Sequence, residues 1–451
     1  MSDATPKRQL TLFDTTCIIV GIIIGAGIYK STPDIANCVN SGPMLLLAFA
    51  IGGFITLLGA LCYAELATAY PREGGDYVYL SRAFGRRAGF LFAWGELWVV
   101  RPGNIGAMAF VFAEYAVQLP WWLGGGGSLL TYALAAVLLL TVVNVLGVQT
   151  GKWTQNVLTS VKVVGLLGVF AVGLWLLGTR SPEPQPATAT WGGGFRLAMI
   201  LVLFTYGGWN EMSYVAAEVR NPRRNIFRAL VLGTIAVTGV YLLVNIAFLG
   251  ALGFQGVRNT NALAADVLRI PFGSAGATAI SLLICISCLG AINGMIFTGS
   301  RVYYALGKEH RMFAWLGRWN GALQTPVRSL VVQGAVTMTM IALFYLAIGE
   351  NSFTGLVAFS DPFFWFFMVM VGVGFFILRE GDARTARPFR TPAYPLTPYF
   401  FYLSSLFMLH AAVTYAMSQS PGDRPWYLYF ESLWPVGIML LGLVLSWFDR
   451  P

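Results

Sequence analysis

Two glycine-rich interruptions inside apolar segments carry the backbone groups that could bind a small solute. The first is Gly25-Ala26-Gly27, in the first apolar segment, and the second is Gly207-Gly208, in the sixth. A helix rarely loosens in the middle of a bilayer unless the freed backbone is buried in protein or lines a water-filled cavity. Two similarly placed breaks in the two halves of one chain therefore indicate a binding site of the kind found in membrane transporters.

The first interruption could bind both an anionic and a cationic group. A helix that ends near Gly25 and restarts near Gly27 points free N–H groups and a positive dipole end into the membrane, which suits a carboxylate. The carbonyls that end the first half, at Ile22 and Ile23, could accept hydrogen bonds from an ammonium. The alternative is structural, because Gly21 and Gly25 form a GxxxG pattern that lets another helix pack closely.

The second interruption is unfavourable in a regular helix, since two consecutive glycines cost about 2 kcal/mol relative to two alanines. A kinked structural helix is one interpretation. We instead expect carbonyls here to face an ammonium, with the Phe204 ring covering the site as a gate. Asn210 and Glu211 follow directly and are candidates for the surroundings of the site. A zwitterion such as an amino acid fits both interruptions. The backbone groups expected around the ammonium are those of Phe204, Thr205, Tyr206 and Gly207.

Ionisable residues inside membrane segments are functional candidates by default, and Lys162 lies well inside the fifth segment. A lysine there could exchange a proton or take the place of a bound cation, so we assign it to coupling. The alternative is a lysine that extends to the cytoplasmic headgroups. We expect a structural ion pair among Glu65, Glu96 and Arg101. Asn293, in the eighth segment, either bonds across helices or lines the site.

The residues expected of an enzyme or a metal site do not form a recognisable pattern in this sequence. The two histidines stand apart, and Cys285-x-x-Cys288 has no second cysteine pair. The five cysteines are expected to pack as buried free thiols. We therefore expect no catalytic residue, no metal and no cofactor.

These residues must be positioned by a polytopic, all-α membrane protein. Of the 451 residues, 57% are hydrophobic and 11% are charged, whereas about a quarter of a soluble chain is charged. Apolar runs of bilayer-spanning length predict twelve transmembrane helices. The expected spans are 13–38, 43–69, 88–118, 128–147, 154–178, 196–219, 228–252, 273–306, 327–348, 353–378, 398–417 and 430–448.

The distribution of lysine and arginine predicts the topology. Most of them fall in alternate loops that share a side with the tail containing Lys7 and Arg8, so both termini are expected in the cytoplasm. The net charge of +9 is then a topology signal, and the expected surroundings are a lipid bilayer without nucleic acid. We interpret the first apolar run as a retained helix of a plasma-membrane protein, or of an inner-membrane protein if the source is bacterial.

The matched glycine breaks also predict how the chain is divided. The extended linker Ser181–Pro186 separates five helices from the next five, where an inverted repeat requires a boundary. The expected parts are a tail at 1–12, a first five-helix repeat at 13–180, a second at 195–378, and helices 11 and 12 with the C-terminal tail at 397–451.

Five stretches together resemble the amino acid–polyamine–organocation superfamily, and within it bacterial relatives of the L-type amino acid transporters. The Tyr-Gly-Gly-Trp-Asn stretch, followed by a Glu-x-x-Asn-Pro loop, is the most specific of them. They are Gly25-Ala26-Gly27-Ile28-Tyr29, Leu97–Gly103, Tyr206–Asn210, Glu218–Asn225 and Gly290–Arg301.

This resemblance implies a LeuT-type fold, with a five-plus-five inverted repeat and two extra helices. It also implies that Gly25, Ala26 and Gly27 bind the substrate carboxylate and that Phe204 is the gate. Lys162 matches the lysine that stands where sodium-coupled relatives bind their ion, which implies sodium independence. The animal relatives join a heavy chain through a cysteine after the third helix, but the loop Leu119–Ser128 has no cysteine, so no such disulfide is expected.

We therefore expect a secondary-active transporter of neutral L-amino acids that works by exchange or proton coupling through alternating access. A carrier of cationic amino acids or polyamines is the alternative, and Glu211 is the only carboxylate that the sequence places near the site. A non-transporting membrane sensor of amino acids is the alternative from another class.

Overall fold

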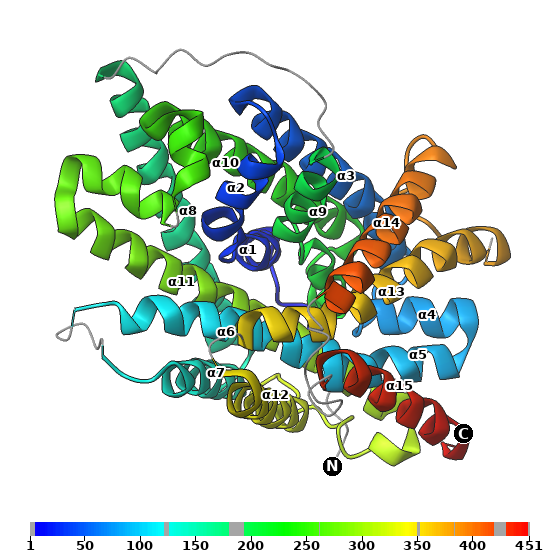
Figure 1. Cartoon of the computed structure of the whole chain (residues 1–451). Helices are drawn as coiled ribbons and strands as arrows, with labels where there is room; N and C mark the ends of the chain where they lie inside the picture. Colours follow the sequence, from blue (N-terminus) through cyan, green and yellow to red (C-terminus); the bar gives the residue numbers. More distant parts are fainter. Residues whose placement is uncertain are drawn as a thin grey trace.

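The computed structural model describes residues 5–120, 126–179, 194–260, 262–349, 352–382, 384–418 and 430–449. Within these ranges the chain is helical, with two isolated bridge pairs and no sheet (Figure 1). The expected linker Ser181–Pro186 and part of the loop Leu119–Ser128 lie outside these ranges.

The described helices range from single 3₁₀ turns to helices long enough to cross a bilayer. The elements in chain order are α1 (Leu12–Ile23), α2 (Gly27–Cys38), α3 (Gly42–Ala69), α4 (Asp76–Phe84), α5 (Arg86–Gly95), the π-helical η1 (Glu96–Val100), α6 (Arg101–Val117), α7 (Leu129–Val145), α8 (Val148–Thr179), α9 (Phe195–Thr205), the 3₁₀-helical η3 (Trp209–Glu218), α10 (Pro222–Asn259), α11 (Leu263–Glu309), the 3₁₀-helical η4 (Arg311–Phe313), α12 (Val327–Ile348), α13 (Ser352–Gly381), α14 (Leu396–Ser418) and α15 (Phe430–Phe448).

The helix lengths fit a polytopic membrane protein. Seven described helices are long and apolar enough to span a bilayer, and the bent pair α1 and α2 makes an eighth. The other expected spans correspond to α5 with η1 and α6, to α7, to α9 with η3, and to α15. These are interrupted or shorter than a regular span.

Both expected helix breaks are present. The axis bends by 45° between α1 and α2, and α9 gives way to the tighter η3 after Thr205. Gly208 has φ of 99°, a left-handed conformation that side chains disfavour. A Cβ there would stand 2.5 Å from Ile22 Cγ2, so glycine also lets the second break approach the first.

Three helical features differ from the expected spans. The short helix α4 was not anticipated, because its sequence is too polar and short for a hydropathy signal. Helices α10 and α11 extend beyond the predicted runs, and each kinks at a glycine with positive φ, Gly253 and Gly273 respectively.

The broken helices lie in the centre of the molecule. Figure 1 shows α1, α2 and α9 together, with α8, α10 and α11 on one side and α6, α7 and α12 on another. Helix α2 packs against α9, and α1 packs against α8, α10 and α11. Three long helices therefore support the helix that leads into the first break.

Candidate functional site

A cavity of about 110 Å³ lies between the two breaks and is closed by α6 and α13. By volume it has room for several water-sized groups, which fits a small solute. The sequence-predicted residues that line it are Ile22, Ile23, Gly25, Ala26, Gly27, Phe204, Thr205, Gly207 and Glu211.

A larger groove, of about 630 Å³, runs between α8 and α11. Its wall is largely apolar and includes the exposed residues Val161, Val164 and Phe272. Such a surface suits lipid chains better than a zwitterion, so the smaller cavity is the candidate site.

The first break leaves donors and acceptors beside this cavity. Helix α2 begins at Gly27, and the first N–H groups of any helix lack an intrahelical partner. In the described ranges no hydrogen bond uses the Ile22 carbonyl, whose regular helical donor would be the Ala26 N–H, and the Gly25 N–H turns back to the Ile23 carbonyl at 2.8 Å. The break therefore presents N–H groups and a carbonyl to one space, as an amino acid head group requires.

The second break is tied to the first by a single hydroxyl. Tyr241 of α10 donates to the Ile23 carbonyl at 3.0 Å and is within 3.1 Å of the Thr205 carbonyl. The Phe204 carbonyl accepts from the Gly207 N–H at 3.0 Å. Some carbonyls expected to face a substrate thus already accept one hydrogen bond. Each carbonyl oxygen has a second lone pair, which can accept another hydrogen bond from a substrate ammonium.

Lys162 is fully buried and does not extend to the headgroups. Its Nζ donates to the carbonyls of Gly21, Ile24 and Ser287, each at 2.8 Å. All three ammonium protons are therefore used by the end of α1 and by α11. Ser287 also donates its hydroxyl to the Ile24 and Gly25 carbonyls, at 2.8 and 3.0 Å.

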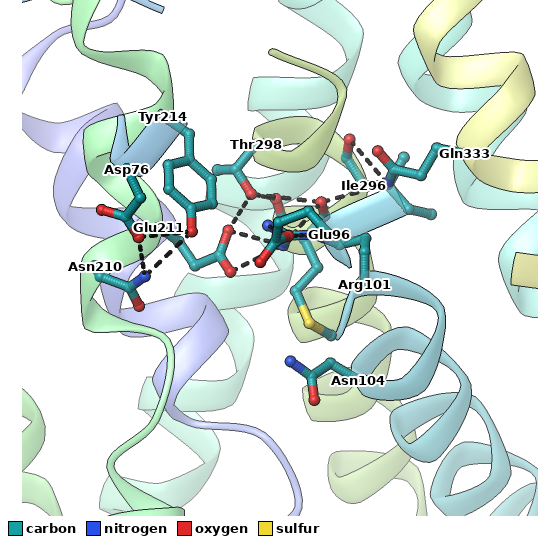
Figure 2. Close-up of polar contacts among 12 residues, drawn as sticks. Asp76, Glu96, Arg101, Asn104, Asn210, Glu211, Tyr214, Ile296, Thr298 and Gln333 are labelled. Carbon is teal, nitrogen blue, oxygen red and sulfur yellow. Dashed lines mark hydrogen bonds and ion pairs between the residues drawn. The ribbon is translucent and has the colours of Figure 1, made fainter. Parts of the chain in front are cut away.

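A buried charge cluster lies directly beside the cavity (Figure 2). The expected pair forms between Arg101 Nη2 and Glu96 Oε2, at 2.9 Å. Arg101 Nη1 also contacts both carboxylate oxygens of Glu211, at 2.8 and 2.9 Å. Thr298 donates to Glu211 Oε2 at 2.5 Å. The π-helical turn η1 ends immediately before Arg101, and this bulge lets two carboxylates reach one guanidinium.

Glu65 does not join that cluster, so the expected ion pair among the three residues is the one between Glu96 and Arg101. The Glu65 carboxylate instead pairs with Arg379 at 2.7 Å and with Arg387 at 3.3 Å. It also accepts the Thr391 N–H at 2.7 Å. Glu65 therefore holds the segment after α13 against α3.

Three other predicted residues lie outside the cavity lining. Asn210 donates toward Asp76 Oδ2 at 3.4 Å (Figure 2), and Tyr206 donates its hydroxyl to the Phe49 carbonyl at 3.0 Å. Asn293 bonds across helices to Asn144 and Gln155. Each holds a helix near the site rather than facing the solute.

The structure adds polar lining residues that the sequence reasoning missed, Asn104 on α6 and Asp361 on α13. Asp361 is a single carboxylate inside an apolar run, and an ionisable residue in a membrane segment is a functional candidate by default. That signal was available in the sequence. The Asn104 side chain carries no charge, and its position could not be inferred without the packing of α6 against α13.

The comparisons with known proteins cover nearly the whole chain. The family model described as "Amino acid permease" matches residues 10–441. The b(0,+)-type amino acid transporter 1 of Mus musculus is 33% identical over 420 residues, covering 90% of this chain and 83% of the relative. The serine/threonine exchanger SteT of Bacillus subtilis is 29% identical, covering 89% of this chain and 90% of the relative. The large neutral amino acids transporter small subunit 2 of Homo sapiens is 32% identical, covering 74% of this chain and 64% of the relative.

Family and relatives are transporters and not enzymes, which confirms that expectation. A cavity lies between the two helix breaks, and the region matched by the family model includes both breaks. The chain therefore belongs to the amino acid permease family of the amino acid–polyamine–organocation superfamily, as a relative of the L-type transporters.

Proposed function

We propose that this protein is a secondary-active transporter of α-amino acids. The observation that carries the proposal is the cavity shared by both helix breaks, which offers N–H groups and carbonyls within one small space. The names of the relatives, a b(0,+)-type amino acid transporter and a serine/threonine exchanger, support an amino acid as the solute.

The amino acid head group is held by the backbone in this proposal. The N–H groups at Ala26 and Gly27 bind the carboxylate at the positive end of α2. The third expected donor, the Gly25 N–H, is bonded to the Ile23 carbonyl in this structure. The ammonium lies against the carbonyl of Ile22 and those that end α9. Phe204 lines the cavity, and its ring acts as the gate. Since the head group of every α-amino acid is the same, these contacts recognise the class and leave side-chain choice to α6 and α13.

Lys162 makes the transport independent of sodium in this proposal. Its ammonium occupies a set of three carbonyls at the end of α1, and carbonyl oxygens in such a set are ligands that a sodium ion would also use. A permanent cation there replaces a transported one. The driving force is then exchange of one amino acid for another, or a proton.

The architecture that we propose is a twelve-span, five-plus-five inverted repeat with broken helices 1 and 6. The boundaries are those given above, at 13–180 and 195–378, with the remaining helices at 397–451. Alternating access arises when the broken helices rock against the surrounding bundle. Both termini lie in the cytoplasm of a plasma or inner membrane. No disulfide-linked heavy chain is involved.

The test begins with binding by the purified protein. We expect one or more L-amino acids to raise its melting temperature through mass action, whereas polyamines leave it unchanged. Gly208→Ala should abolish the shift, because its Cβ would press on Ile22. Gly168→Ala is the matched control, since nothing lies within 4 Å of the added Cβ.

Reconstituted vesicles then separate transport from sensing. Uptake of a labelled amino acid that is stimulated by internal amino acid indicates exchange, and uptake driven by an inward proton gradient indicates proton coupling. Replacement of sodium by choline should have no effect on either. Binding without any flux would favour a sensor and contradict the proposed function.

A further inference from the structure

Asp361 is the one carboxylate of the cavity lining that has no ionic or hydrogen-bonding partner in the described ranges. It lies in the middle of α13, between Ser360 and Pro362. Ser360 packs against α6 and donates toward Asn104 at 3.4 Å, so the position of the neighbouring Asp361 is fixed by this helix contact. Asp361 is half-buried, and a carboxylate within a membrane segment is costly unless a ligand or a neighbour supplies the opposite charge.

The other cavity carboxylate, Glu211, already has a cationic partner, which it shares with Glu96. Glu211 receives two hydrogen bonds from Arg101 and one from Thr298. Figure 2 shows these bonds converging on it. No lysine or arginine lines the described cavity. Asp361 is therefore the lining carboxylate that no cationic side chain contacts in the described ranges.

Two aromatic rings accompany Asp361 along the same face of α13. Phe364 and Trp365 follow it by three and four residues, a spacing that places all three side chains on one side of a helix, and all three line the cavity. Aromatic faces attract cations and also accept an apolar side-chain stem. This wall of the cavity combines an anion with aromatic surface, whereas the helix breaks supply the backbone groups.

We propose that Asp361 is a specificity-determining residue that binds the cationic side chain of a basic amino acid. The proposal rests on the function proposed above, because the head group must be held at the breaks for its side chain to reach α13. The substrate range then includes amino acids with an ammonium or guanidinium at the end of an apolar stem. Glu211, the candidate carboxylate that the sequence placed near the site, is instead bonded to Arg101.

The test compares L-lysine with L-alanine as ligands of the intact protein. Affinities are measured by competition against a labelled amino acid, for wild type, Asp361→Asn, Asp361→Glu and the control Asp34→Asn. Asp34 is an exposed carboxylate on α2. We expect Asp361→Asn to lower the affinity for L-lysine by about tenfold or more relative to the affinity for L-alanine. Asp361→Glu should keep the preference, and Asp34→Asn should leave both affinities unchanged.

The possible outcomes separate this proposal from the proposed function. An unchanged ratio of the two affinities in Asp361→Asn, or a wild type that binds L-alanine but never L-lysine, overturns the role of Asp361. An equal loss for both ligands together with loss of proton-driven uptake also overturns it, since Asp361 would then carry a proton. A wild type that binds no amino acid at all contradicts the proposed function itself.

Discussion

Replacement of Lys162 by methionine is the most direct test of how the first break is held. Methionine keeps a long unbranched side chain in the buried space but removes the ammonium. In the wild type that ammonium donates to the Gly21, Ile24 and Ser287 carbonyls. We expect Lys162→Met to fold but to bind amino acids more weakly, because the end of α1 loses its anchor.

Loss of the Lys162 ammonium does not affect its three carbonyl partners equally. Ser287 lies inside α11, where its carbonyl also belongs to the helix, and the Ile24 carbonyl keeps the Ser287 hydroxyl at 2.8 Å. The Gly21 carbonyl has no other donor in the described ranges, because the Gly25 N–H turns to Ile23. Leaving one buried acceptor unsatisfied costs about 1–3 kcal/mol. A central value of about 2 kcal/mol corresponds to a loss of roughly 30-fold in affinity.

The assay is calorimetric titration of the purified protein with the amino acid that gives the largest thermal shift. Lys308→Met is the matched control, because Lys308 is exposed near the end of the same helix that contains Ser287. Its affinity should equal that of the wild type. If Lys162→Met folds and binds within about threefold of the wild type, the carbonyl contacts do not maintain the site and the reasoning is refuted.

Three further substitutions test separate parts of the site. Phe204→Ala should speed release of a bound labelled amino acid by about tenfold through loss of the covering ring, and an unchanged release rate would remove the gate assignment. Tyr241→Phe removes the hydroxyl shared by both breaks, so affinity measured by titration should fall about tenfold, for a cost of about 1–3 kcal/mol; equal affinities would show that the shared bond is dispensable. Arg101→Lys keeps the charge but not the planar fork, so the melting temperature should fall by several degrees, whereas exposed Arg328→Lys should not change it.

The positions of the helix breaks could be predicted because they have a local cause. Consecutive or closely spaced glycines weaken a helix wherever they stand, and both breaks lie within a residue or two of the expected positions. Position 208 requires glycine for a second reason, which cannot be inferred from the sequence. Its missing side chain makes room for Ile22, a contact between segments almost two hundred residues apart.

The partners of buried charges were harder to predict because they depend on helix packing. Glu65 and Arg101 are both isolated charges in apolar runs, and the sequence offers no means of deciding between their possible partners. The structure pairs Glu65 with Arg379, 314 positions away, and Arg101 with Glu211, 110 positions away. Asp361 did carry a signal in the sequence, as a single carboxylate inside an apolar run, but its lack of a partner is visible only in the packed structure.

The distribution of hydrogen bonds at the breaks explains why a substrate would bind there. A break in mid-membrane leaves backbone groups that water cannot reach, so each needs a partner. Lys162 and Tyr241 supply donors to carbonyls at the breaks, and Ser287 supplies another. The groups that they do not satisfy include the Ile22 carbonyl and the N–H groups at the start of α2, near Gly27. Their opposite polarity matches a zwitterion, so a bound amino acid would complete the hydrogen bonding that the fold leaves open.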